Sequence, residues 1–191
     1  MAPQIFSQTI QATILSATSN ILAQALSAYR TNQTLHLNPT PILKFALYTF
    51  LNTPPNCLWQ AYLEDTFPTQ PLAPPPPKAT EKPPPPPPKT QPISLANVAK
   101  KLALDQTVSA AVNTVLFLAF MGYLNASGEA AVESASAEVR NKFWPLLLDG
   151  YKLWPLFSVV SFMWIPVEKR VVVGSLVGVL WGIYLSLLAE A

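Results

Sequence analysis

Uncharged polar side chains recur along the first 30 residues at intervals of three and four. They are Thr9, Thr13, Ser16, Asn20, Gln24 and Ser27. In a single α-helix this spacing puts all six on one face. Hydroxyl and amide groups form hydrogen bonds without carrying charge, so the face suits either neighbouring helices or neutral solutes in a water-filled path. We take Thr13, Ser16, Asn20 and Gln24 as candidate pore-lining residues, with hydrogen bonding between helices as the alternative.

A second polar pair lies near the middle of the chain. Gln106 and Asn113 are seven residues apart, so one helix carries both on the same face, two turns from each other. We expect them to line the same polar cavity. Asp105 precedes them at the start of a helix, where the helix dipole by itself explains a carboxylate.

Catalytic and metal chemistry is not expected. Five stretches contain no Asp, Glu, His, Lys or Arg, namely 1–29, 45–63, 106–128, 153–167 and 171–189. A buried catalytic site would need such groups gathered together. The single histidine, His36, and the single cysteine, Cys57, have no partner for a metal site or an intramolecular disulfide. We therefore expect neither an enzyme nor a cofactor, and the net charge of +2 does not suggest nucleic acid.

The uncharged stretches predict helices in a bilayer. Half of the residues are hydrophobic and 12% are charged, against about 25% charged in a soluble domain. Four stretches have the length of a membrane span, about 20 residues, whereas 153–167 is shorter and bounded by Pro155 and Pro166. Residues 129–152 mix charged and aromatic side chains, as an interfacial amphipathic helix does. The expected fold is all-α: one membrane domain over residues 1–191, with four spans, a short proline-bounded segment and an interfacial helix.

A proline-rich insert separates the second and third expected spans. Residues 68–92 contain 13 prolines, and such runs form extended, solvated polyproline II. We interpret the insert as a spacer. Pro84, Pro87 and Lys89 also fit a P-x-x-P-x-K ligand pattern, which makes a protein that binds proline-rich ligands an alternative partner.

The last expected span carries half of the chain's six glycines, Gly174, Gly178 and Gly182, at four-residue spacing. Glycines so spaced form a groove that another helix can approach closely. The groove predicts packing within the bundle or, alternatively, a homo-oligomer, and Gly178 at its centre is expected to tolerate a side chain least.

The C-terminal third carries a set of residues in a fixed order. They are Trp154, Pro155, Phe162, Pro166, Arg170, Trp181 and Tyr184. This order resembles the signature of the Mpv/PMP family of peroxisomal and mitochondrial membrane proteins. Pro54, Trp59, Leu63 and the pair Asp105-Gln106 also match the family, while Ser19 and Asn20 replace its Gly-Asp and Cys57 replaces a His. On its own chemistry, Arg170 is expected to snorkel to the membrane edge or pair with Glu168.

The resemblance implies an organelle membrane protein similar to a weakly selective channel for small solutes, linked to metabolite permeability and reactive oxygen species. The alternative is a non-conducting scaffold that recruits soluble partners through the proline-rich insert. The expected partners are thus the lipid bilayer and small solutes. No basic residue precedes Arg30, so we expect no cleaved leader and place the protein in the peroxisomal membrane, with the mitochondrial inner membrane as the alternative.

Overall fold

The computed structural model describes residues 2–70 and 92–189, with the backbone alone for 184–189. Its elements are α1 (Ala2–Arg30), α2 (Pro39–Thr66), α3 (Leu95–Leu104), the π-helix η1 (Asp105–Ser109), α4 (Ala110–Asn125), α5 (Ala130–Gly150), α6 (Trp154–Trp164) and α7 (Val167–Ala189). Every regular element in this described part is helical. The prediction of an all-α fold is therefore confirmed.

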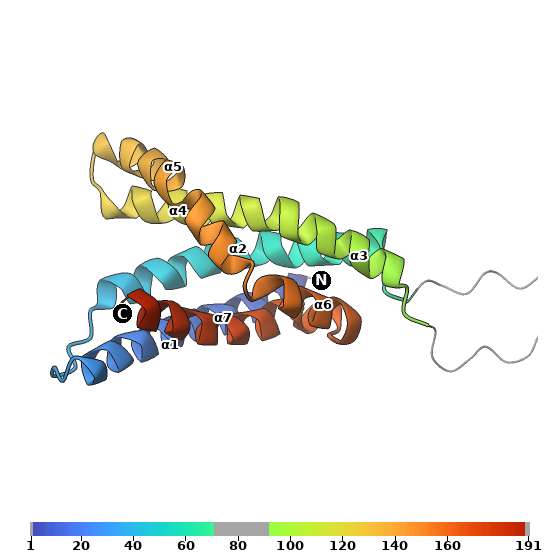
Figure 1. The fold of residues 1–191 in the computed structure, drawn as a ribbon, viewed down its shortest axis with the longest axis horizontal. Helices are drawn as coiled ribbons and strands as arrows, with labels where there is room; N and C mark the ends of the chain where they lie inside the picture. Colours follow the sequence, from blue (N-terminus) through green and yellow to red (C-terminus); the bar gives the residue numbers. More distant parts are fainter. Residues whose placement is uncertain (1, 71–91, 190–191) are drawn as a thin grey trace, which may run out of the picture.

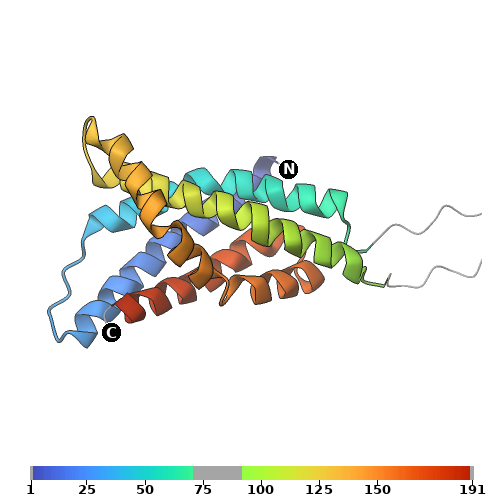
Figure 2. The same ribbon diagram turned by 45° about the horizontal axis from the view of Figure 1, so that its top comes forward.

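The helices form a bundle with α2 at its centre (Figure 1). Helix α2 packs against α1, α4 and α7, and α1 also packs along α7. Helices α3, η1 and α4 run on as one rod, and α5 folds back along α4. Figure 2 shows the same bundle turned by 45° about the horizontal axis. Helix α6 lies against α3, near the end of the bundle where α2 ends and α3 begins.

Length and apolar composition identify fewer membrane spans than predicted. In the part of the chain that the structure describes, one helix passes this test, the rod Leu95–Asn125. A second passes if α5 and α6, which meet at 54°, count as one bent span. The expectation of four firm spans overlooked that an uncharged helix need not be strongly apolar. Helix α1 is rich in Ser, Thr, Asn and Gln, and α2 carries Asn52, Asn56 and the pair Pro54-Pro55 among its apolar residues. Helix α7 is described with side chains only as far as residue 183, so its described part is too short for this test.

Local sequence explains where the helices begin and end. The Asn38 side chain caps α2 by accepting a hydrogen bond from the Thr40 backbone N–H, and Pro39 occupies the first turn, where no donor is needed. Ser94 caps α3 in the same way through Asn97. Pro166 separates α6 from α7, as a residue without a backbone donor does. The predicted short segment 153–167 is thus the 11-residue helix α6.

The predicted interfacial helix, residues 129–152, corresponds to α5, which packs tightly on α4. A Cβ atom on Gly122 of α4 would lie 2.7 Å from the Cα of Ala135 in α5. Contacts this short between backbones are open only to glycine. Gly122 therefore makes the closest contact of the described glycines, although it does not belong to the four-residue glycine spacing seen in the sequence.

The glycine face of α7 is covered by residues of the same chain. Gly174 faces Phe157 of α6, and Gly182 faces Ser19 of α1, whose Oγ would lie 2.9 Å from an added Cβ. At Gly178 the nearest atom, on Trp154, is 4.0 Å away. The expectation that Gly178 tolerates a side chain least is not met for an added Cβ, because the closest approach to α1 is at Gly182, one turn further along.

The proline-rich insert, residues 68–92, lies outside the described residues from 71 to 91, but its two ends are held together. The Ser94 N–H donates to the Thr69 carbonyl at 2.9 Å, and the Asn97 side-chain amide donates to the Pro68 carbonyl at 2.9 Å. The end of α2 and the start of α3 therefore meet at a closed neck.

We expect replacement of residues 71–91 by Gly-Ser-Gly to leave the melting temperature in detergent unchanged. The neck already brings the ends together, and loop length alters closure entropy only slowly. A matched deletion of 69–91 should lower the melting temperature, because it removes Thr69, whose buried hydroxyl donates to the Phe162 carbonyl at 3.0 Å. If the two variants lowered the melting temperature equally, the insert itself would pack on the bundle.

Candidate functional site

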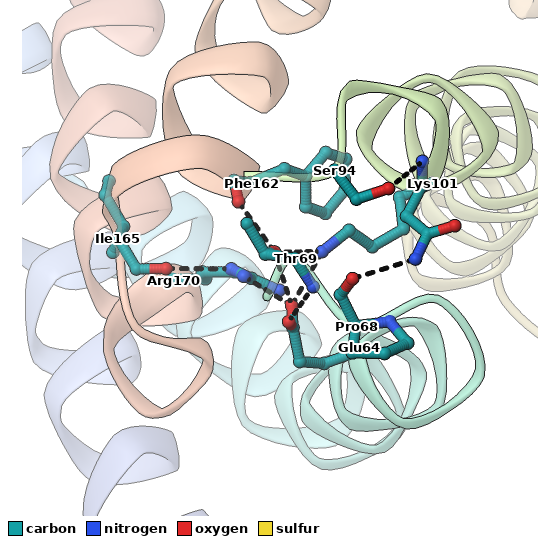
Figure 3. Close-up of polar contacts among 9 residues, drawn as sticks. Glu64, Pro68, Thr69, Ser94, Lys101, Phe162, Ile165 and Arg170 are labelled. Atoms are coloured by element: carbon teal, nitrogen blue, oxygen red, sulfur yellow. Dashed lines mark hydrogen bonds and ion pairs between the residues drawn. The ribbon is translucent and has the colours of Figure 1, made fainter. Parts of the chain in front are cut away.

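A cluster of charged residues joins three helices next to the neck (Figure 3). Glu64, near the end of α2, accepts hydrogen bonds on Oε2 from Lys101 of α3 at 2.7 Å and from Arg170 of α7 at 2.6 Å. Its Oε1 accepts from the Thr69 N–H at 2.7 Å. The Thr69 hydroxyl accepts from Lys101 at 2.5 Å. We call Glu64, Thr69, Lys101, Phe162 and Arg170 the ionic cluster.

The ionic cluster buries two cations around one carboxylate. Lys101 is 0% exposed and Arg170 is 5% exposed. The Phe162 ring lies close to both, with its centroid 5.3 Å from Lys101 Nζ and 5.2 Å from Arg170 Cζ. An aromatic face attracts cations and offsets part of their desolvation. The Phe162 ring and the Glu64 carboxylate thus stabilise the two buried cations. Arg170 Nε also donates to the Ile165 carbonyl at 3.0 Å.

Glu64 stays ionised far into the acid range. It lies one residue beyond the uncharged stretch 45–63. Burial by itself would raise the pKa of Glu64, but hydrogen bonds from Lys101, Thr69 and Arg170 outweigh burial and lower the pKa to about 2. The cluster therefore acts as a fixed ionic tie between α2, α3 and α7 at neutral pH.

The ionic cluster corrects one prediction and explains part of the C-terminal signature. The expectation that Arg170 snorkels or pairs with Glu168 is wrong, because Arg170 is buried and pairs with Glu64 of α2. Signature residues Phe162 and Arg170 both belong to the cluster, and Pro166 makes the turn between them. Trp154 packs beside Gly150 and Gly178, and Trp181 lies in α7; the side chain of Tyr184 lies outside the described residues.

A line of polar groups runs between α2 and the η1–α4 rod, with the carboxylate of Asp105 and the Ser158 hydroxyl of α6 at one end. At one end, the Asp105 carboxylate accepts hydrogen bonds from Ser158 at 2.9 Å, Gln106 at 3.1 Å, Gln60 at 3.3 Å and Trp59 at 3.4 Å. Asp105 begins the π-helix, a local widening that is frequent at functional sites. We call Gln60, Asp105, Gln106, Ser158, Asn52 and Asn113 the polar seam.

Two amide oxygens of the polar seam lack partners. Gln60 Oε1 and Gln106 Oε1 are buried, and neither accepts a hydrogen bond from any residue that the structure describes. A buried acceptor left unpaired costs about 1–3 kcal/mol. Such atoms therefore mark places where water or a polar solute would bind.

The polar seam continues along α4 and then meets aromatic rings. Asn52 donates to Asn113 Oδ1 at 2.9 Å, and the Tyr48 hydroxyl donates to the Asn113 carbonyl at 3.2 Å. Beyond them, Tyr48 packs against Phe117 and Phe120 with ring centroids 5.2 and 5.4 Å apart, and Phe45 packs against Phe117 at 5.6 Å. These four rings form the aromatic cluster, an apolar section that follows the seam.

The structure separates the six predicted pore-lining residues into two groups. Gln106 and Asn113 lie on the polar seam. In α1, Thr13 donates to the Thr9 carbonyl at 2.8 Å, Ser16 accepts from Thr49 of α2 at 2.9 Å, and Gln24 exchanges two hydrogen bonds with the Asn38 backbone. Asn20 is half-buried in the same helix. These α1 side chains thus contact their own helix, α2, or the residue that caps α2.

Sequence reasoning missed Gln60 and Asn52, which complete the seam from α2. They lie eight residues apart, close to two helical turns, and that spacing was the available signal. In the described residues no group of His, Cys, Asp and Glu could hold a metal ion.

Comparison with known proteins gives a consistent set of relatives. Residues 126–186 match the model of the Mpv17 / PMP22 family. Protein sym1 of Schizosaccharomyces pombe is 26% identical, over 96% of this chain and 84% of its own. Peroxisomal membrane protein 2 of Bos taurus is 27% identical over 93% and 79%. Mitochondrial inner membrane protein Mpv17 of Danio rerio is 33% identical over 46% and 48%. No solved structure matches the chain.

Proposed function

Because this chain belongs to the Mpv17 / PMP22 family of membrane proteins, we propose that it crosses an organelle membrane several times and provides a weakly selective path for small solutes. Its relatives include a peroxisomal membrane protein and a mitochondrial inner membrane protein. We place this protein in the peroxisomal membrane, with the mitochondrial inner membrane as the alternative.

The outward faces of four helices support a polytopic arrangement. Each exposes large aliphatic side chains along one side: Ile10, Ile14 and Ile21 in α1; Leu43, Leu47, Leu51 and Leu58 in α2; Val108, Val112 and Leu116 in η1 and α4; and Leu176 and Leu180 in α7. Apolar surface of this extent is unusual for a soluble monomer and suits lipid contact. We therefore propose that α1, α2, α4 and α7 supply the four spans, with Glu64 outside the span of α2, after the uncharged stretch 45–63.

The polar content of α1 is compatible with this proposal. The hydroxyls of Thr9, Thr13 and Thr18 each donate to the carbonyl four residues earlier in the same helix. A hydroxyl satisfied in this way costs less in lipid than an unpaired one. The free energy needed to place α1 in a bilayer is therefore lower than its low hydropathy suggests.

The proposed solute path follows the polar seam and narrows at the aromatic cluster. The unpaired oxygens of Gln60 and Gln106 carry the proposal, since they offer a passing solute or water the acceptors that the described residues leave free. Apart from the Asp105 carboxylate, the seam consists of amides and a hydroxyl, so we expect it to accept small polar solutes with weak selectivity. The resemblance to the family adds to this proposal a link to metabolite permeability and reactive oxygen species. Catalysis is not part of the proposal.

We expect Asn52→Leu combined with Asn113→Leu to reduce the conductance of the purified protein in a planar bilayer several-fold. The double change removes both members of an amide pair, so it leaves neither amide buried and unpaired, while a solute loses two polar groups along its path. The matched control is Thr18→Leu, since Thr18 is exposed on α1 and its hydroxyl donates to the Ile14 carbonyl of the same helix. The control should conduct as the wild type does.

The competing function is a non-conducting scaffold that recruits soluble partners through the proline-rich insert. The closed neck favours it, because a protein could bind the insert without disturbing the helices. A silent wild-type protein in the bilayer would support the scaffold. Steady conductance that the Asn52/Asn113 double variant leaves intact would place the path elsewhere.

A further inference from the structure

A cleft lies at the end of the bundle away from the ionic cluster, between the start of α2, the end of α4 and α5. Its volume is about 520 Å³, within the range of small-molecule sites. Its apolar part is built from Phe45, Phe117, Leu118, Met121, Pro145 and Leu146. Charged and amide side chains lie along one side of this apolar part.

Among the described residues, the charges around the cleft leave one cation without a carboxylate. Glu138 pairs with Lys142 at 2.8 Å, and Asp149 pairs with Lys152 at 2.5 Å. Lys44 instead donates to the Asn125 amide oxygen at 2.7 Å, and an amide does not neutralise an ammonium group. The four charged side chains that line the cleft, Lys44, Lys142, Glu138 and Asp149, balance in number. Of the two lysines, Lys44 is bonded to an amide and not to a carboxylate, so its ammonium group can turn to an anion.

The first turn of α2 adds to the positive field of Lys44. Asn38, Thr40 and Pro41 line the cleft beside Lys44. Helix α2 is 28 residues long, and its N-terminus carries the positive end of the helix dipole. The Thr40 hydroxyl can donate into the same space. The N–H groups of this turn are not free, because Pro39 and Pro41 have none and the Thr40 N–H donates to Asn38. The helix therefore contributes only the field of its dipole, and a cation and a hydroxyl within that field suit a phosphate oxygen.

The cleft also lies where two uncharged stretches end. Residues 45–63 begin directly after Lys44, and residues 106–128 end three residues after Asn125. In a membrane-spanning bundle these boundaries mark the level at which hydrocarbon gives way to headgroups. A ligand at this level would place an alkyl chain on the rings and a headgroup beside Lys44.

We propose that this cleft binds a phospholipid of the surrounding membrane that has a net negative headgroup, with its phosphate at Lys44 and Thr40 and part of an acyl chain against Phe45, Phe117 and Met121. The site rests on the membrane placement in the proposed function but does not need the solute path. Lipid binding can be measured on protein that conducts nothing, so the two proposals fail separately.

The test is native mass spectrometry of the detergent-purified protein with added phosphatidylglycerol or phosphatidylcholine. The wild type should retain phosphatidylglycerol in preference. Lys44→Gln should weaken phosphatidylglycerol retention about fivefold, the effect of one basic residue at an anionic membrane surface, and leave phosphatidylcholine unchanged. Lys44→Arg should keep the preference. The matched control is Lys100→Gln, which removes an exposed lysine from α3 at the far end of the bundle.

A second variant tests the apolar part of the cleft. Met121→Trp fills it and should reduce retention of both lipids. If Lys44→Gln fails to fold, Thr40→Val tests the phosphate site instead, because it removes the Thr40 hydroxyl and keeps the shape of the first turn. Thr40→Val should then weaken phosphatidylglycerol retention. Equal losses in Lys44→Gln and Lys100→Gln would overturn the proposal, since they indicate attraction by total charge. Displacement of phosphatidylglycerol by an equal concentration of palmitate would overturn it as well, by showing a single-chain carboxylate site.

Discussion

Gly122→Ala should lower the melting temperature of the protein in detergent by several degrees, although it adds only one methyl group. The added Cβ would lie 2.7 Å from the Ala135 Cα and 2.9 Å from the Ser134 carbonyl oxygen. Both atoms belong to the backbone of α5, so no side chain can rotate out of the way. Overpacking of this kind costs about 1–3 kcal/mol.

The matched control for Gly122→Ala is Gly178→Ala. Both glycines lie inside long helices, so the gain in helix propensity is the same, but at Gly178 the nearest atom to an added Cβ is 4.0 Å away. Gly178→Ala should therefore be neutral or stabilising. Two equal melting temperatures would mean that α5 moves freely relative to α4 and that the close contact does not hold the bundle together.

Glu64→Gln should destabilise the bundle by about 3–5 kcal/mol, the cost of removing one member of a buried ion pair. The change leaves Lys101 and Arg170 buried with no carboxylate between them. The measurement is thermal unfolding in detergent. Glu138→Gln is the control, because its partner Lys142 is largely exposed and such pairs contribute about 0–1 kcal/mol.

Two further measurements separate charge from shape at Glu64. Converting Lys101 and Arg170 to Met in the Glu64→Gln background should recover much of the lost stability, since no unpaired charge then remains. In the wild type, the stability from Glu64 is present above the pKa of an unfolded glutamate and should be lost as the pH falls toward 2. Failure of the triple variant to recover would assign the loss to packing instead.

Composition predicted the all-α fold and the short α6, because charge-free stretches and prolines mark helices and their ends locally. It overestimated the clear spans, because α1 lacks charge yet is rich in hydroxyls and amides. Part of the polar seam could be predicted from the sequence, because Gln106 and Asn113 follow helical spacing within one helix. Their partners Gln60 and Asn52 lie on another helix, and only the packing of α2 against α4 brings them together.

Arg170 shows why the ionic cluster could not be predicted. Its carboxylate partner Glu64 is 106 residues away in sequence, whereas Glu168 lies two residues away and seemed the natural choice. Two residues apart on a helix, however, side chains point in different directions. The burial of Lys101 was equally hidden, since a lysine before an apolar stretch usually remains in water.

The closed neck bears on how this protein can change over generations. Because Thr69 and Ser94 join the two ends of the insert, additions and losses of residues between them do not shift α2 or α3 along their axes. Selection on folding can therefore act on the two anchoring residues and leave the segment between them free to lengthen, shorten or change composition. A proline-rich sequence could arise at this point without any compensating substitution in the helices.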